Sequence, residues 1–377
     1  MKQRLGFFAI LTALLPSAVG CNSILGIKEH SLADAGGGSG GDTGTAGNGG
    51  TGTAGGSGSG GTTVGPGCSV DGSVMDADGV DAAVGTTCGF LMPNPVNAPG
   101  DLPNRASYRK NQATKIVTDN VTGLTWEAEV DATTVYTQHD AITHCANKAG
   151  GGWRLPTRIE LVSLLDFTVA KPGPTISSAA FANDPVWTDT PDVNGDYRKF
   201  WTSSHAAFDT ATGWEVDFSD GSTHQKPATG FYKARCVTGS PCRCPPTRYQ
   251  VQGSTPADEV VHDAFTGLTW QRAISDTKMV WITAETSCPA GWRLPTPTEL
   301  PTIVDETKET PSLDGETFPM TPGEPFWTSA PQTGSVDGGT PAFAWYVTFY
   351  HGHSDVYPSN DPANFAWWVR CVRWDGP

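Results

Sequence analysis

The cysteines are the residues of this sequence whose chemistry is easiest to infer. There are nine of them, and Cys21 directly follows the small residues Ser17–Gly20. This arrangement is typical of a lipobox, where a signal peptidase cuts before the cysteine and the thiol carries diacylglycerol. The alternative is an ordinary signal peptide cut after Ala18 or Gly20, which leaves a free thiol. Without Cys21, eight cysteines remain, and an even number in an exported chain favours disulfides.

Five sequence blocks occur twice, in the same order. The first copies are 119–126, 152–157, 200–203, 214–218 and 235–237, and the second copies are 263–270, 291–296, 326–329, 345–349 and 370–372. Chance does not produce such a series, so the chain carries two tandem domain-sized units. We place repeat 1 at residues 105–240 and repeat 2 at residues 241–377.

Two cysteines recur at matching positions in both repeats. Cys145 and Cys236 of repeat 1 correspond to Cys288 and Cys371 of repeat 2. The simplest pairing is one disulfide within each repeat, Cys145–Cys236 and Cys288–Cys371. Four cysteines allow three connectivities, so the pairing of the others stays open. These are Cys68, Cys88, Cys242 and Cys244.

Patterns that would indicate catalysis or a bound metal are scarce. The sequence contains no nucleophile elbow, no Gly-rich phosphate loop and no His-Glu-x-x-His motif. His351 and His353 could coordinate a metal, but at that place repeat 1 offers only His224. We therefore predict no catalytic residue, no metal site and no cofactor, and we do not expect an enzyme.

The Trp-Arg-Leu-Pro-Thr block at 153–157 and 292–296 is the clearest motif. It could present an exposed Trp and Arg to a ligand. We favour a structural role instead, with Arg154 and Arg293 paired internally, for example to Glu160 and Glu299. The threonine and the glutamate of each block have the spacing of a capping box, which predicts a helix start.

Each repeat is predicted to be α+β. A short helix follows the Trp-Arg-Leu-Pro-Thr block, to about Asp166 or Asp305, and an earlier helix carries Cys145 or Cys288. The blocks at 214–218 and 345–349 alternate apolar and polar residues, as half-buried strands do. We expect two short helices and a small antiparallel sheet in each repeat.

The first hundred residues have a different organisation. A charged start and the short apolar run Leu5–Leu15 predict a lipoprotein signal peptide over residues 1–20. Residues 21–67 comprise the lipidated N-terminus and a Gly/Ser/Thr linker. This linker lacks any apolar period and is predicted to be a disordered tether. Residues 68–104 contain two cysteines, and we assign them no fold.

Composition restricts the partners and the location. The net charge of −15 argues against binding to nucleic acid. The lipid on Cys21 would make a membrane the first partner, and Asn22 is not the aspartate that retains lipoproteins at the inner membrane. We therefore expect an exported, lipid-anchored protein, located at the outer membrane.

The repeated blocks resemble the DUF1566 family, also called the Legionella collagen-like protein C-terminal domain. The resemblance covers Thr122–Trp126, Trp153–Leu161, Trp201–Ser203 and Arg235–Val237, and again Thr266–Trp270, Trp292–Leu300, Trp327–Ser329 and Arg370–Val372. It implies a unit similar to the C-type lectin-like fold, which formylglycine-generating enzymes also use. The paired catalytic cysteines of formylglycine-generating enzymes have no counterpart in this sequence, and the sequence motifs of calcium-dependent lectins are missing. The named family member adheres and binds sulfated glycans.

These observations favour a non-enzymatic binding or adhesion protein displayed on the cell surface. Two tandem repeats on a tether would gain avidity for a repeated ligand, such as a glycan or an extracellular polymer. Trp187 and Tyr197, in a loop that differs between the repeats, are the candidate ligand-binding residues. The alternatives are an enzyme of the formylglycine-oxidase or hydrolase kind, and a structural envelope protein.

Overall fold

The computed structural model describes residues 90–171, 173–181, 184–187, 198–239, 248–255, 258–334, 336–337, 340–359 and 365–375. These residues belong to one compact body. None of their helices is long and apolar enough to cross a membrane. The signal peptide and the tether lie outside the described residues, as do Cys21, Cys68, Cys88, Tyr197, Cys242 and Cys244.

Four antiparallel strands form the first sheet of repeat 1. Val117 on one strand lies opposite Trp126 on the next, and both side chains are fully buried. Such cross-strand pairs of large apolar residues stabilise a sheet and give it a core face. The strands, in spatial order, are β1 (Tyr108–Asn111), β2 (Ile116–Asp119), β3 (Thr125–Glu127) and β7 (Val237–Thr238).

The helical segments of repeat 1 are short, and two of them begin at side-chain caps. The Thr157 hydroxyl and the Glu160 carboxylate each accept from the other residue's backbone N–H, which completes the predicted capping box. Thr137 caps the earlier helix, which buries Ala141 and Cys145. The segments are α1 (Gln138–Ala146), α2 (Arg158–Val162), α3 (Ser178–Phe181) and the 3-10 turn η1 (Pro185–Trp187).

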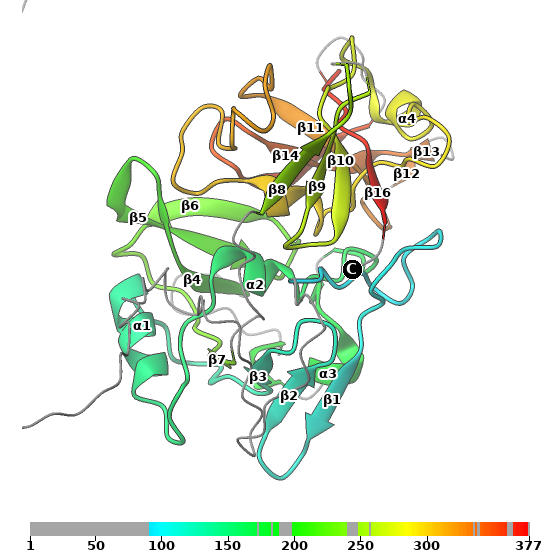
Figure 1. Cartoon of the computed structure of the whole chain (residues 1–377). Coiled ribbons are helices and arrows are strands. Elements are labelled where there is room, and N and C mark those ends of the chain that lie inside the picture. Colours follow the sequence, from blue (N-terminus) through cyan, green and yellow to red (C-terminus); the bar gives the residue numbers. More distant parts are fainter. Residues whose placement is uncertain are drawn as a thin grey trace, which may run out of the picture. The chain divides into compact units, whose positions relative to one another are not determined.

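Repeat 2 contains a matching antiparallel sheet, in which Val261 lies opposite Trp270 (Figure 1). Its helical segments are shorter than those of repeat 1. Pro301 has no N–H to donate, so an α-helix cannot continue through it, and a 3-10 turn forms instead. The strands, in spatial order, are β16 (Val372–Trp374), β10 (Leu268–Gln271), β9 (Val260–Asp263) and β8 (Tyr249–Gln252). The helical segments are α4 (Trp281–Ala284) and η2 (Leu300–Ile303).

A third antiparallel sheet of six strands runs through both repeats. Its two halves meet where Ser354 N donates to Thr223 Oγ1 at 3.0 Å. The order is β11 (Pro325–Pro331), β14 (Phe343–Thr348), β15 (Ser354–Pro358), β6 (Thr223–Pro227), β5 (Asp209–Asp217) and β4 (Lys199–Ala206). A separate pair consists of β12 (Val336–Asp337) and β13 (Thr340–Pro341). The repeats therefore share one sheet.

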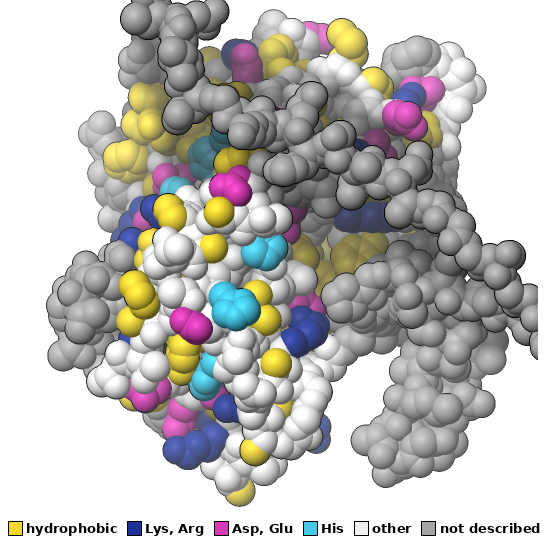
Figure 2. Space-filling view, turned by 90° about the vertical axis from the view of Figure 1, so that its left-hand side faces the viewer, with side chains coloured by type: hydrophobic (Ala, Val, Ile, Leu, Met, Phe, Trp, Pro, Cys, Tyr) yellow, Lys and Arg dark blue, Asp and Glu magenta, His cyan; other side chains and the backbone are white. Residues whose placement is uncertain are grey.

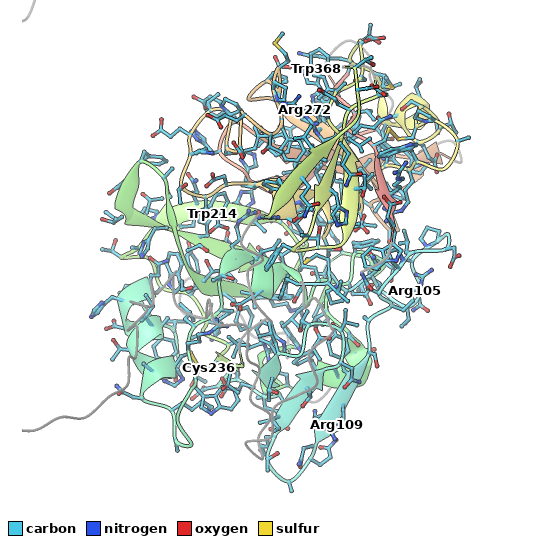
Figure 3. The ribbon with its side chains drawn as sticks, in the orientation of Figure 1. Arg105, Arg109, Trp214, Cys236, Arg272 and Trp368 are labelled. Atoms are coloured by element: carbon cyan, nitrogen blue, oxygen red, sulfur yellow. A yellow bond between two sulfur atoms is a disulfide. The ribbon has the colours of Figure 1, made fainter. Side chains whose placement is uncertain are left out.

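Arg158, the first residue of α2, adds side-chain contacts between the repeats. Its buried guanidinium binds Glu306 of repeat 2, with Nε 2.5 Å from Oε1. Nη1 donates to the carbonyl oxygen of Gly352 at 3.1 Å. The same guanidinium lies 4.7 Å from the ring centroid of Trp214, which Figure 3 labels. The buried charge is thus paired and covered by an aromatic ring, as buried charges require.

Residues 90–104, which we call the clasp, precede repeat 1 but contact both repeats. Phe90 belongs to the core of repeat 1 and stacks on Phe265 of repeat 2, with ring centroids 5.6 Å apart. Leu102 packs in a small apolar cluster with Trp345 of repeat 2. The clasp therefore ties the two repeats together where the sequence had suggested no fold.

Among the described residues, each repeat contains one disulfide, Cys145–Cys236 in repeat 1 and Cys288–Cys371 in repeat 2. These are the two pairs that the sequence predicts. The bonded Cα atoms are 5.4 and 5.8 Å apart, within the usual range for a disulfide. In repeat 1 the bond connects α1 to Cys236, directly before β7 (Figure 3).

The predicted α+β class is wrong, because the described chain is mostly β. Three antiparallel sheets dominate it, and α1, with nine residues, is the longest helix among the described residues. The capping motifs do mark helix starts, but a cap does not determine length, which depends on packing. In repeat 2 the helix expected to carry Cys288 ends at Ala284. The relationship to the C-type lectin-like fold stays a prediction.

Candidate functional site

The Trp-Arg-Leu-Pro-Thr blocks form internal ion pairs in both repeats. Arg154 binds Glu160 through two hydrogen bonds of 2.7 and 2.6 Å, and Arg293 binds Glu299 through two of 2.6 and 2.7 Å. Burial alone would raise the pKa of Glu299, but the charge of Arg293 and the hydrogen bonds outweigh it and hold that pKa below its usual value. The arginine of each motif is therefore paired internally with the glutamate, as the sequence predicts.

An open pocket of about 640 Å³ lies beside this scaffold in repeat 2. Binding pockets for small ligands usually measure about 300 to 1,000 Å³ and combine aromatic walls with a few polar groups. This pocket has both features. The side chains that give it its chemistry are Asp101 and Asn104 of the clasp, Trp292 and Arg293 of the motif, and Arg373 and Trp374 of β16.

The two tryptophans of the pocket are half-buried. Their bodies pack against apolar clusters of repeat 2, which fixes the rings in place. The Arg373 guanidinium covers part of Trp292, 4.6 Å from the ring centroid. Arg373 is itself held by Asp375, with Nε 2.9 Å from Oδ1. A fixed pair of indole rings beside a positioned guanidinium can stack on a flat or ring-shaped ligand.

Several polar groups in the pocket have no partner among the described residues. They are the indole N–H groups of Trp292 and Trp374, the Asp101 carboxylate and the Asn104 amide. Together they supply donors as well as acceptors of hydrogen bonds. A ligand that carries hydroxyl or amine groups can therefore bind without breaking any contact that the fold already uses.

The clasp side of the pocket is anchored to the motif. The Asn94 amide donates to the Glu299 carboxylate at 3.4 Å and to the carbonyl oxygen of Pro103 at 3.0 Å. Arg105, labelled in Figure 3, donates to carbonyl oxygens within the clasp. Asn104, which directly precedes Arg105, has a φ of 53°, in the left-handed region that Asn tolerates better than most residues. Glu299 thus holds both sides of the pocket in register.

Repeat 1 lacks this pocket chemistry. Where repeat 2 continues from its last shared block with Arg373 and Trp374, repeat 1 continues with Thr238 and Gly239. Trp153 corresponds to Trp292, but the Lys148 ammonium lies 5.6 Å from its ring centroid. The two repeats share their scaffold but differ in their surface at this place.

A second group of polar residues lies on one face of the shared sheet. The pKa of His353 is lowered to about 4, mainly by burial and to a smaller extent by nearby positive groups. Its ring lies 6.0 Å from that of His224, whose pKa burial also lowers. Burial raises the pKa of Glu215, and both its carboxylate oxygens lack a hydrogen-bond partner. Figure 2 shows histidines on the face of the molecule that is turned to the viewer.

Perturbed pKa values often accompany catalysis, so this group tests the enzyme alternative. None of its residues lines any of the three pockets described for the chain. Within the described residues, no three His, Cys, Asp or Glu side chains are placed to hold a metal ion.

Of the two ligand-binding residues that the sequence suggests, the structure describes only Trp187. Trp187 is half-buried in the core of repeat 1, where its indole N–H donates to the carbonyl oxygen of Phe181 at 3.0 Å. It does not line the pocket of repeat 2, and a binding role for it stays a prediction. Tyr197 lies outside the described residues.

The sequence indicated a possible ligand-binding role for Trp292 and Arg293, but it did not point to the other pocket residues, although a signal for two of them existed. Arg373 and Trp374 directly follow the Arg-Cys-Val block of repeat 2, where the two repeats stop matching. An exposed Trp-Arg pair in only one copy is the kind of difference that separates a binding surface from a scaffold. Asp101 and Asn104 gave no such signal, because their contribution depends on how the clasp folds.

Comparison with known proteins supports the duplication. The family described as the Lcl C-terminal domain matches residues 115–238 and again residues 259–373. A search of curated proteins gave no match. The family match suggests a non-enzymatic protein of surface or adhesion type. The chain belongs to the Lcl C-terminal domain family and carries two tandem copies of its domain.

Proposed function

We propose that this protein is a surface-displayed lipoprotein that binds a saccharide of an envelope or extracellular polymer in the pocket of repeat 2. The pocket itself carries the proposal. It combines two fixed indole rings with unpaired donors and acceptors, and the scaffold does not need those polar groups. The family match, which suggests a surface or adhesion protein, agrees with this function.

A saccharide fits the chemistry of this pocket. The C–H face of a sugar ring is apolar and packs on an aromatic ring, while its hydroxyl groups point outward as donors and acceptors. Trp292 and Trp374 provide the rings. Asp101 and Asn104 provide hydrogen-bond partners at the edge. An open pocket also admits an internal stretch of a long polymer rather than only its end.

The remaining parts of the proposal concern location. Cys21 carries the lipid, the membrane is the partner of the N-terminus, and the outer membrane is the destination. The predicted tether then holds the folded body away from the membrane. The two disulfides support a place in an oxidising compartment. Because the pocket is described in repeat 2, avidity would arise from many chains on one surface rather than from two repeats of one chain.

The sharpest test uses repeat 1 as a template. The double substitution Arg373→Thr with Trp374→Gly gives repeat 2 the residues that repeat 1 has at this place. Because repeat 1 folds with them, we expect the fold to tolerate the change. Buried tryptophans at binding surfaces often contribute about 2 kcal/mol or more, so affinity for oligosaccharides should fall at least about thirtyfold. A saccharide panel followed by calorimetry with the full chain measures this loss.

The repeats also supply a matched control. Trp292→Ala removes a pocket ring, whereas Trp153→Ala removes the corresponding ring of repeat 1. Both changes cost similar packing, but only the first should abolish binding. Equal binding by both variants, or no saccharide binding by the unaltered protein, would contradict the proposal.

The anchor is tested separately, because a failed anchor leaves the pocket untouched. Cys21→Ala should move the protein from the membrane fraction to the soluble fraction and remove the mass of the lipid. Unchanged membrane partitioning would show that the thiol of Cys21 does not hold the anchor.

A further inference from the structure

The two arginines of the pocket are already neutralised by the protein. Arg293 gives both of its terminal nitrogens to Glu299, at 2.6 and 2.7 Å. Arg373 is paired with Asp375, with Nε 2.9 and 3.1 Å from the two carboxylate oxygens. Neither arginine is left with an unbalanced charge for an anionic ligand.

The carboxylate of Asp101, unlike the two arginines, is not paired with an opposite charge in the part of the chain that the structure describes. It lines the pocket, its residue is exposed, and it has no ion-pair partner among the described residues. With Arg293 balanced by Glu299 and Arg373 balanced by Asp375, Asp101 leaves the pocket with one net negative charge. A positive group of the ligand would find its partner there.

Repeat 2 as a whole also carries a net negative charge. Residues 241–377 contain eight Lys and Arg against sixteen Asp and Glu, whereas residues 105–240 contain thirteen against fifteen. A surface with this excess of negative charge repels a polyanion over distances up to the Debye length of about 8 Å at physiological salt, and it attracts a polycation. The pocket and the surface around it therefore prefer the same ligand charge.

We propose that the ligand is a polysaccharide of amino sugars that carries free ammonium groups. This inference rests on the proposed saccharide-binding function and adds the charge of the ligand. The sugar rings stack on Trp292 and Trp374. An ammonium group binds Asp101 and lies close enough to the indole faces for a cation–π interaction. A sulfated or carboxylated polymer would place its anions against Asp101 and Asp375.

The test compares three oligosaccharides of equal length against the full chain by calorimetry. The first is a β-linked glucosamine hexamer, the second is its fully N-acetylated form and the third is a sulfated form. We expect the free amine to bind about two- to fivefold more tightly than the N-acetylated form for one exposed ion pair, and the sulfated form to bind least. The advantage of the amine should shrink when the salt concentration rises.

Variants show where the charge acts. Asp101→Asn should remove the preference for the amine, so that the amine and the N-acetylated hexamer bind the variant with similar affinity. Glu309→Gln, which removes an exposed carboxylate of repeat 2 that does not line the pocket, is the matched control and should keep the preference. The double change Arg373→Thr with Trp374→Gly should abolish binding of both hexamers.

The possible failures are distinct. If the N-acetylated or the sulfated hexamer binds as well as the amine, the inference about ligand charge is overturned and the saccharide function stands. The same holds if Asp101→Asn keeps the full preference. If the amine binds equally to the double pocket variant, it binds elsewhere on the acidic surface, which also overturns the inference. If no hexamer binds, the proposed function itself is refuted.

Discussion

Removal of the Asp184 carboxylate should destabilise repeat 1 far more than the loss of a surface ion pair. Asp184 forms an ion pair with Arg235, and the side chains of both residues are fully buried. The guanidinium lies among aromatic rings, 4.9 Å from the centroid of Phe181 and 5.3 Å from that of Phe200. Asp184→Asn leaves this charge with the carbonyl oxygen of Glu127 but no counter-charge among the described residues. Loss of one partner of a buried pair costs about 3 to 5 kcal/mol.

Urea unfolding followed by tryptophan fluorescence measures this loss as a lower midpoint. The control is Glu129→Gln, which breaks the exposed pair between Lys115 and Glu129 and should cost less than about 1 kcal/mol. If Asp184→Asn lowers the free energy of unfolding by no more than the control does, the burial argument is wrong. Arg370, the counterpart of Arg235, has no carboxylate partner among the residues that the structure describes, and burial lowers its pKa to about 9.

Three further predictions concern stability. Burial is the main cause, and nearby carboxylates the second, of the raised pKa of Glu215. The folded state therefore binds this proton more tightly than the unfolded state does. The stability that the proton contributes is lost as pH rises from about 4.5 through the raised pKa. Glu215→Gln should therefore raise the urea midpoint at pH 8 but not at pH 4; an equal effect at both would contradict this. Replacing Cys288 and Cys371 with serine opens a loop of 83 residues and should cost about 4.5 kcal/mol in the chain-entropy estimate, measured by the same unfolding assay; a loss below 1 kcal/mol would refute it. At Gly221, whose φ is 84°, an added Cβ would lie 2.6 Å from Trp345, so Gly221→Ala should cost about 1 to 3 kcal/mol, and thermal unfolding unchanged by it would rule out this packing.

The features that both repeats share could be predicted from the sequence. Cys145 and Cys236 recur with their partners, so the disulfides followed from position alone. The pairing of Arg154 with Glu160 followed from a local capping motif. Such features depend on neighbours in the chain or on duplication, and both are visible in a linear sequence.

Features that depend on distant contacts could not be predicted. Thr223 and Ser354 meet where the repeats join their sheets, and nothing in the alternation of either strand shows that its edge is paired. The clasp contains four prolines and one glycine, and its apolar residues follow no regular spacing, so its contact with Phe265 has no periodic signal. The helices were expected to be longer because a cap shows where a helix starts and not where it ends.

The candidate site lay at the limit of what the sequence shows. Trp187 looked like a binding residue because it stands in a variable loop, yet its ring completes the core of repeat 1. Trp374 stands directly after a shared block and was not singled out from the sequence, yet it lines the pocket.

The central claim is that a saccharide binds between Trp292 and Trp374. Indole N–H signals of the full chain, assigned by single Trp→Phe substitutions, can be followed by nuclear magnetic resonance during titration with the glucosamine hexamer. The indole signals of Trp292 and Trp374 should shift together and saturate at the same ligand concentration, while that of Trp153 stays in place. Shifts confined to other tryptophans, or no shift at saturating ligand, would contradict the account.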